Sequence, residues 1–431
     1  ESWVKTTLEG PGQIIFNWKI SSEEYYDKLS FYIDDQRIVS VSGNVDWSLE
    51  SHNIVDGNHT VRWQYKKDIS ETDGMDYAWL DAVAYRQGLY KWDQIEQGPW
   101  WDLNHDPPWR TRHALEYDSD REKAVLFGGL ATSLTHRVPV PLKGTLLNDT
   151  WEHDGTKWER IRTDGAPSSR MYHAMAYHSA RGKMVLFGGV DEKDSPLDDT
   201  WEYDGSNWEL IGNISSPSPR LQTAMAYDSE RERIVLFGGI AEDLVCFDDT
   251  WEYDGYNWQL IGTNTSPPPR KAASMVYDNL RDRIVLFGGG QGGLSDTWEY
   301  DGINWKLIET ANRPPPREYH ALAYDSIREK TILFGGIYSW WDNTAWTYRE
   351  LYYNDIWEYN GTNWLPVDFD ADERMPSVRS NHGLIYNDSM DRFMVFGGNG
   401  PGMHYNGEWE LEPPPLLPRQ RGDFNADGCA N

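Results

Sequence analysis

The sequence of 431 residues predicts an all-β protein in which a six-bladed β-propeller follows a small β-sandwich. Three observations predict this fold class. One sequence pattern returns six times after about residue 110, each copy is built of short β-branched and aromatic segments, and turns rich in glycine and aspartate separate those segments. The expected domains are a sandwich over 1–86, a propeller over 90–411 and a tail over 412–431.

The first 86 residues alternate apolar and polar side chains without matching the repeat. The alternation is clearest at 14–20, 29–33 and 59–65, with turns at 34–35 and 56–58. It indicates strands that bury one face, as in a β-sandwich. This segment resembles the jelly-roll modules that stand next to repeats in bacterial surface proteins. The marks of the resemblance are Gly-Pro-Gly at 10–12, the strand at 31–34 and Trp-Leu-Asp at 79–81.

The jelly-roll resemblance implies a module that either binds sugars or acts as a spacer. An edge strand missing before Glu1 would leave the sandwich with one unpaired strand.

The repeat itself is clearest in the copy at 220–261. It opens with Arg220 and an apolar stretch, then reaches the run Ile-Val-Leu-Phe-Gly-Gly at 234–239. After a loop come Asp-Thr-Trp-Glu-Tyr-Asp-Gly at 249–255 and Trp-Gln-Leu-Ile at 258–261. Each copy therefore holds four short strands. The spacing of 47 to 62 residues between copies fits a four-stranded blade rather than a helical solenoid.

Two marks recur in the copies. A glycine pair begins at Gly128, Gly188, Gly238, Gly288, Gly335 and Gly397. A tryptophan stands in the third strand, at Trp151, Trp201, Trp251, Trp298, Trp357 and Trp409, and a second opens the fourth strand, at Trp158, Trp208, Trp258, Trp305 and Trp364. Glycine lets the chain leave a strand where a side chain would clash or where φ is positive. The aromatic faces need a neighbouring blade to cover them, so the copies must close into a ring.

These residues resemble the kelch repeat, which is marked by a di-glycine after the second strand and a spaced Tyr/Trp pair further on. The resemblance covers about 90–411 and implies a β-propeller. It implies little about function, because one fold carries many functions.

The sixth copy is one strand short. It supplies strands at 379–386, 393–397 and 408–411, and prolines at 413–415 follow instead of a fourth strand. The segment 90–96, which opens Tyr-Lys-Trp-Asp-Gln-Ile, resembles the fourth strands of the other copies. We therefore expect this segment near 90–96 to complete the sixth blade, which closes the ring and removes two open sheet edges.

The charge balance narrows the expected partners and location. The chain has 40 Lys and Arg against 69 Asp and Glu, a formal net charge of −29, which repels phosphate backbones and disfavours nucleic acid as a partner. No apolar run approaches the roughly 20 residues of a membrane helix, so membrane insertion is not expected. With only Cys246 and Cys429, the chain is not a disulfide-stapled scaffold. We expect a secreted, extracellular or cell-surface protein whose sequence begins at a mature or truncated end.

The tail combines a proline-rich linker at 412–420 with a calcium-type motif. Asp423, Asn425 and Asp427 stand at alternate positions before a glycine, as in the first half of an EF-hand loop. The motif resembles the opening of a dockerin repeat, which implies Ca²⁺ as a cofactor. The sequence ends three residues before the position that supplies the bidentate carboxylate, so the site is incomplete. Continuation of the parent protein and decay of the tail both remain open.

An arginine opens the first strand of every copy, and two interpretations are open. These residues are Arg110, Arg170, Arg220, Arg270, Arg317 and Arg379. They could form a ring of cationic donors for a carboxylate or sulfate ligand. Alternatively, each pairs with an acid that recurs at the same period, at Asp149, Asp199, Asp249, Asp296 and Asp355. Four copies carry a histidine three residues later, but ligands on separate blades lie too far apart for an expected metal site.

Long loops between the second and third strands break the repeat, at 130–147 and 337–353, and such loops often carry function. The candidate ligand-binding residues of the second loop are Tyr338, Trp340, Trp341, Trp346, Tyr348 and Arg349. Aromatic side chains with a few polar groups suit a sugar platform or a protein hot spot. The alternative is that these aromatic residues cover the propeller end or pack on the N-terminal domain.

The sequence holds no serine-hydrolase elbow, zinc-protease helix motif or phosphate loop, so we expect no enzyme. The first functional hypothesis is an extracellular binding or adhesion protein that engages a glycan or a protein. The second is a structural subunit that self-assembles into a filament, lattice or matrix. A secreted carbohydrate-active hydrolase is the third, because paired carboxylates are plentiful.

Overall fold

The computed structural model describes residues 2–22, 27–67, 77–88, 90–95, 106–131, 144–212, 215–290, 292–343, 346–369, 374–401, 403–404 and 407–414. The chain divides into two compact units. The first unit comprises Glu1–Lys91, Asp368–Ala371 and Pro413–Asn431, and the second comprises Trp92–Val367 and Asp372–Glu412. The described residues are almost entirely β-strands and turns, with one 3₁₀ turn, η1 (Ser179–Arg181), and none of their helices has the length and apolar character to span a bilayer.

The first unit holds one antiparallel sheet of five strands in the order β3-β2-β4-β1-β5. The strands are β1 (Ser2–Ser21), β2 (Lys28–Ile33), β3 (Gln36–Val41), β4 (Asn44–Lys66) and β5 (Tyr77–Gln87). β5 pairs with the second half of β1, and β2 pairs with β3 on one side and with the last residues of β4 on the other. The two long strands β1 and β4 therefore carry different neighbours at their two ends.

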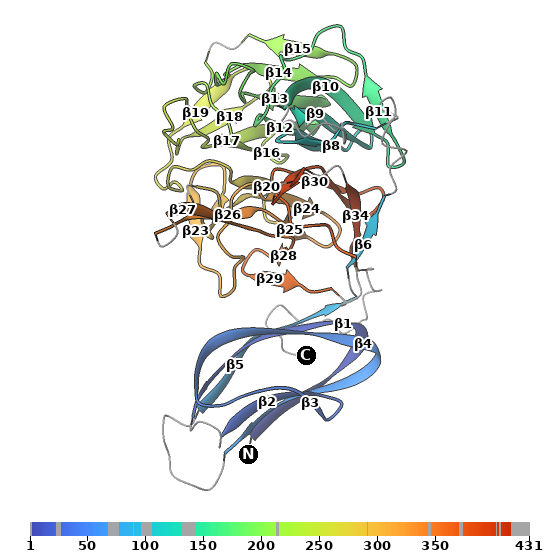
Figure 1. Cartoon of the computed structure of the whole chain (residues 1–431), viewed down its shortest axis with the longest axis vertical. Helices are drawn as coiled ribbons and strands as arrows, with labels where there is room; N and C mark the ends of the chain where they lie inside the picture. Colours follow the sequence, from blue (N-terminus) through green and yellow to red (C-terminus); the bar gives the residue numbers. More distant parts are fainter. Residues whose placement is uncertain are drawn as a thin grey trace. The chain divides into compact units, whose positions relative to one another are not determined.

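This sheet bends over on itself, which forms the two layers of the predicted sandwich (Figure 1). The Phe16 ring lies 5.2 Å from the Trp63 ring, although Trp63 pairs with Val4 on the other half of β1. Twelve residues of straight strand would separate those positions by about 40 Å. One of the two register shifts between β1 and β4 falls between Gly10 and Gly12, and a side chain on Gly10 would lie 1.7 Å from the Val55 carbonyl oxygen. The Gly-Pro-Gly sequence therefore marks the bend.

The second unit is a propeller, and its described residues form six antiparallel blade sheets, five of four strands and one, the first, of five. The first three blades are β7 (Arg110–Thr111) with β8 (Ala114–Asp118), β9 (Lys123–Ala131), β10 (Thr145–His153) and β11 (Trp158–Ile161); β12 (Ala174–His178), β13 (Lys183–Phe187), β14 (Thr200–Tyr203) and β15 (Trp208–Ile211); and β16 (Ala224–Asp228), β17 (Arg233–Phe237), β18 (Thr250–Tyr253) and β19 (Trp258–Ile261). β7 and β8 together form the inner strand of the first blade.

The remaining blades follow the same strand order. They are β20 (Ser274–Asp278), β21 (Arg283–Phe287), β22 (Thr297–Tyr300) and β23 (Trp305–Ile308); β24 (Ala321–Asp325), β25 (Lys330–Phe334), β28 (Ile356–Tyr359) and β29 (Trp364–Val367); and β30 (Gly383–Asn387), β31 (Arg392–Phe396), β34 (Glu408–Glu412) and β6 (Lys91–Gln94). Two hairpins stand outside the blades, β26 (Ile337–Asp342) with β27 (Thr347–Tyr352) and β32 (Asn399–Gly400) with β33 (Met403–His404).

The ring is closed as the sequence predicted, because β6 is the fourth strand of the sixth blade. Figure 1 shows cyan β6 beside red β34, and the Ile95 amide donates to the Glu408 carbonyl at 3.1 Å. The Trp92 ring is buried and lies 6.3 Å from the Trp409 ring. The inner strands adjoin one another around the ring in the order β8, β12, β16, β20, β24, β30 and β8 again. Both ends of the repeat region are thereby held in one sheet.

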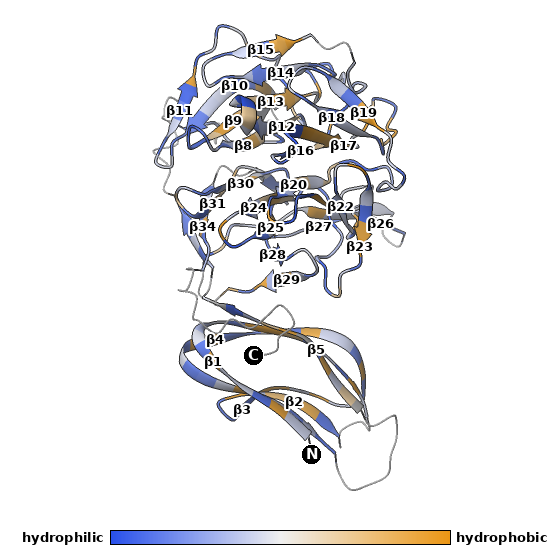
Figure 2. Ribbon diagram, turned by 180° about the vertical axis from the view of Figure 1, so that it is seen from behind, coloured by the Kyte–Doolittle hydropathy of each residue, from blue (hydrophilic) through white to orange (hydrophobic). Residues whose placement is uncertain are grey.

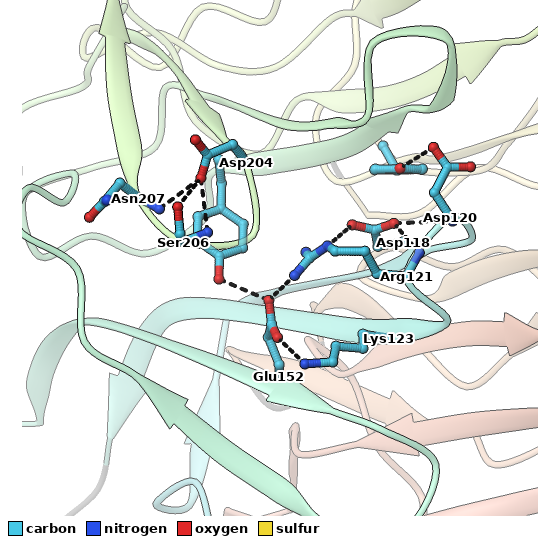
Figure 3. Close-up of polar contacts among 10 residues, drawn as sticks. Asp118, Asp120, Arg121, Lys123, Glu152, Asp204, Ser206 and Asn207 are labelled. Atoms are coloured by element: carbon cyan, nitrogen blue, oxygen red, sulfur yellow. Dashed lines mark hydrogen bonds and ion pairs between the residues drawn. The ribbon is translucent and has the colours of Figure 1, made fainter.

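Apolar and polar contacts join neighbouring blades. Middle strands such as β17 are strongly hydrophobic (Figure 2) and buried apart from their first residue. The Trp208 indole donates to the Thr150 hydroxyl of the preceding blade at 2.9 Å, and the Tyr203 hydroxyl donates to Glu152 of that blade at 2.8 Å. Glu152 also accepts a hydrogen bond from Lys123 of its own blade (Figure 3). The tryptophan and tyrosine that mark the repeat are therefore contacts between blades.

The first glycine of each pair faces the next blade at short range. Gly128 has a φ of 61°, and a side chain there would lie 3.0 Å from the Arg170 carbonyl and 3.1 Å from His173 Cε1. A larger residue would therefore be strained by its backbone and crowded by the neighbouring blade.

Candidate functional site

The recurring arginines are structural ion-pair partners in five blades. Arg110, for example, donates to both Asp149 carboxylate oxygens, at 2.8 and 2.9 Å, and to the Gly128 carbonyl at 2.9 Å. The same contacts join Arg170 with Asp199, Arg220 with Asp249, Arg270 with Asp296 and Arg317 with Asp355. These arginines are buried, so they are not the free cationic donors that the ligand interpretation required. The second interpretation holds for these five arginines, because each forms an ion pair with an aspartate of its own blade.

Arg379 of the sixth blade is equally buried. Its guanidinium donates to the Ser377 and Gly397 carbonyls, both at 3.1 Å. It therefore holds the first strand of its blade against the glycine turn, as the other arginines do.

The four histidines pack against phenylalanines of the preceding blade. The His173 ring meets Phe127 edge to face at 5.5 Å, and the other pairs are His113 with Phe396, His320 with Phe287 and His382 with Phe334. Burial lowers the pKa of each imidazole, to about 3 for His173. These rings are neutral packing groups at ordinary pH. Across the described residues, no cluster of three His, Cys, Asp or Glu side chains suits a metal ion.

The second predicted loop forms an exposed hairpin, β26–β27. Its side chains alternate between two faces, and each face is aromatic. On one face, the Tyr338 and Trp340 rings stack 5.3 Å apart at 18°. On the other, Trp341 and Tyr348 meet edge to face at 5.0 Å. Trp346 in the turn is 79% exposed.

Polar contacts within the hairpin fix its side chains. Arg349 pairs across the strands with Trp340, and its Nε donates to Asp342 at 3.1 Å. The Tyr352 hydroxyl donates to Glu350 at 3.1 Å. The hairpin thus presents ordered aromatic surfaces to solvent, and it forms a two-stranded sheet of its own outside the blade sheets.

Other predicted sites fall partly or wholly outside the described residues. In the loop 130–147, the described ends extend β9 and β10, and 132–143 lie outside the described part. The candidate calcium ligands Asp423, Asn425 and Asp427 also lie outside it.

A second candidate site lies where the six first strands enter the propeller channel. One residue per blade forms what we call the mouth ring: Arg112, Tyr172, Gln222, Ala272, Tyr319 and Asn381. Each amide donates to the carbonyl of the preceding member, and Arg112 donates to Asn381, which completes a circle of six hydrogen bonds of 2.9 to 3.1 Å. All six residues have φ between 54° and 61°. Every blade repeats this strained backbone conformation, so the backbone of the ring is part of the propeller fold. Only the side chains of the ring differ from blade to blade.

Comparison with known proteins identifies the repeats. The KLHDC2/KLHL20/DRC7 Kelch-repeats domain matches the chain over residues 84–259, 122–312 and 255–415. Together these matches span most of the chain, including all six glycine pairs. The chain belongs to the kelch-repeat family.

The structural comparison extends the kelch assignment to the fold. The solved structure of YjhT matches with a TM-score of 0.51 and 13% sequence identity, over 71% of this chain and 95% of that one. At this identity the likeness concerns the propeller fold alone. No curated protein matches the sequence.

Sequence reasoning missed the mouth ring, although the kelch repeat contains a signal for it. Each ring member stands two residues after the recurring arginine, and four of the six stand directly before a histidine. The residue types at this position differ widely, from Arg112 to Ala272. A position that varies inside a regular repeat is free of the architectural constraint and is therefore available for binding.

Proposed function

We propose that this kelch-repeat protein is a non-enzymatic, extracellular binding or adhesion protein that engages a glycan or a protein through the hairpin β26–β27. The observation that supports the proposal is the aromatic surface on both faces of a hairpin that belongs to no blade. Single exposed apolar residues are common on protein surfaces, whereas a contiguous exposed aromatic surface is typical of a binding site.

The geometry favours stacking on a flat ligand surface. Tyr338 and Trp340 present nearly parallel rings, which extends one platform along the strand. Arg349 stands beside Trp340 and adds hydrogen-bond donors at the platform edge. Aromatic platforms with polar rims suit sugar rings, and the same residues serve as anchors at protein interfaces.

The test compares native protein with W340A and W341A on a glycan array and in pull-downs of extracellular proteins. Loss of an aromatic anchor is expected to weaken binding at least about tenfold. The matched control is W47A, because Trp47 has similar exposure, 48%, and lies in the first unit. Binding that survives both hairpin variants, or that W47A abolishes equally, would contradict the proposal.

The flanking segments fit a secreted protein of bacterial surface type. We propose that the first unit is a jelly-roll-like module, supported by its sheet bent into two layers at Gly10. The acidic composition supports an extracellular location, and the motif at 423–427 supports a dockerin-like calcium repeat. Calcium binding by a chain extended beyond Asn431, and none by the present chain, is the expected result in equilibrium dialysis.

A structural subunit is the second candidate function. It is favoured by β3, which pairs with β2 alone among the described strands and carries mostly exposed side chains. An edge strand of this kind offers a template for strand addition from another copy. Electron microscopy of native material separates the candidates, because regular filaments or lattices favour assembly and isolated particles favour binding.

A further inference from the structure

Arg112 differs from the six arginines that open the first strands of the blades. Its Nε is buried without a hydrogen-bond partner, and its Nη1 lies 3.5 Å from the Met171 sulfur. Its guanidinium carbon lies 4.9 Å from the centre of the Tyr172 ring. By contrast, Arg110, two residues earlier, is fully paired with Asp149. Within the described part of the chain, no carboxylate forms an ion pair with Arg112, in a protein whose acids outnumber its bases.

A cavity of about 210 Å³ lies at the mouth ring. Small residues one step inside the ring leave this space open, namely Ala114, Ala174, Ala224, Ser274, Ala321 and Gly383. A layer of larger apolar residues follows, namely Leu115, Met175, Met225, Met275, Leu322 and Leu384. This layer lies between the mouth cavity and a second cavity of about 270 Å³, whose lining includes a tyrosine from each blade.

The polar groups that line the mouth cavity leave it positively charged. Gln222 Oε1 is buried there without a partner, and four neutral histidines form part of the wall. Glu116 is the acidic residue in the lining, and burial raises the pKa of its carboxyl to about 8. At pH 7 this carboxyl is therefore mostly protonated and does not repel an anion. The net charge of the lining comes from Arg112.

We propose that the mouth cavity binds a small organic carboxylate, with the carboxylate against the Arg112 guanidinium and the remainder of the ligand over the apolar floor. A planar guanidinium with a free Nε matches the geometry of a carboxylate. Tyr172 and Tyr319 come from opposite blades, and their rings lie 5.9 Å apart across the mouth. This pair narrows the entrance, which favours a small molecule over a protein segment.

The cavity volume sets the size of the ligand. A cavity of about 150 Å³ holds a benzene molecule, so the mouth cavity accepts a six-membered ring with a carboxylate substituent. Benzoate is therefore a suitable probe, and benzamide is its uncharged counterpart of nearly equal size. Inorganic phosphate separates a carboxylate site from a general oxyanion site.

Titration calorimetry with the full chain tests the proposal. Benzoate is expected to bind saturably at about 1 mM or tighter, and benzamide and phosphate at least about tenfold more weakly. R112Q is expected to weaken benzoate binding at least about tenfold, because it removes the charge-assisted hydrogen bonds. The matched control is R313Q, which makes the same charge change at an exposed arginine outside the channel.

The comparison of benzoate with benzamide needs no variant, so it decides the proposal even if R112Q fails to fold. Equal binding of the two probes, no saturable benzoate binding, or unchanged binding by R112Q would each overturn it. Phosphate binding as tight as benzoate would overturn the carboxylate assignment. This site is separate from the hairpin, so W340A is expected to leave benzoate binding unchanged, whatever its effect on glycan or protein binding.

Discussion

The hydrogen bond between Thr150 and Trp208 provides a direct test of how neighbouring blades adhere. Both side chains are buried, and the indole donates to the hydroxyl at 2.9 Å. The same contact, at the same length, joins Thr200 with Trp258, Thr250 with Trp305 and Thr297 with Trp364. T150V replaces the hydroxyl by a methyl group of equal size. It leaves packing intact and deprives the indole of its acceptor.

The expected cost follows from that geometry. A buried donor left without a partner costs about 1–3 kcal/mol, whereas an exposed substitution of the same kind changes the free energy of unfolding by less than about 0.5 kcal/mol. T347V is the matched control, because Thr347 lies exposed on the hairpin. In the double variant T150V/W208F the donor is also absent. Its destabilisation is therefore expected to fall short of the sum of the single variants by about 1 kcal/mol.

Urea unfolding followed by circular dichroism measures these differences, with the slope m compared among variants. The reasoning fails if T150V is as stable as T347V. It also fails if the double variant shows simple additivity, because then no energy couples the threonine to the tryptophan.

Three further predictions concern the propeller. R170M is expected to lower the free energy of unfolding by about 3–5 kcal/mol, because the Asp199 carboxylate loses its buried partner. K19M, at an exposed ion pair, is expected to cost at most about 1 kcal/mol. Equal costs of the two variants in urea unfolding would contradict this prediction. Burial lowers the pKa of His173 to about 3 from an ordinary 6.5, so the unfolded chain binds the extra proton and stability is lost as pH falls from 6.5 towards 3. H173T is expected to reduce this loss by up to about 1.4 kcal/mol per pH unit, and an unchanged acid slope would refute it. Replacing 338–352 by a short Gly-Ser link is expected to change the melting temperature of the propeller by no more than a few degrees and to abolish ligand capture, since the hairpin lies outside the blades. Unfolding of the propeller in this variant would show instead that the hairpin supports the blades.

The ring closure was predictable from the sequence because the sixth copy could be compared strand by strand with the other five. Five copies end in a strand that opens with tryptophan, so the absence of that strand after Trp409 and its presence at Trp92 could be matched. The single bent sheet of the first unit could not be foreseen in the same way. It depends on pairing across the full length of β1 and β4, which local alternation does not specify.

The candidate sites, in contrast, depended more on the structure than on the sequence. The period of Arg170 and Asp199 fits either a ligand ring or an ion pair, and burial decided between them. The sequence located the hairpin because this loop departs from the repeat. Its two aromatic faces could be recognised only from the pairing register of β26 with β27. The mouth ring stayed hidden because Tyr172 and Tyr319 are far apart in sequence and meet only once the ring has closed.

Closure of the propeller by β6 is the claim on which the channel, the mouth ring and its cavity depend. Hydrogen–deuterium exchange of the native chain, resolved at residues 91–95, tests it most directly. The Ile95 amide, which donates to Glu408, is predicted to exchange as slowly as the amides of the blade strands. Exchange of this segment at the rate of an unprotected chain would show that the sixth blade has only three strands, and would contradict the account.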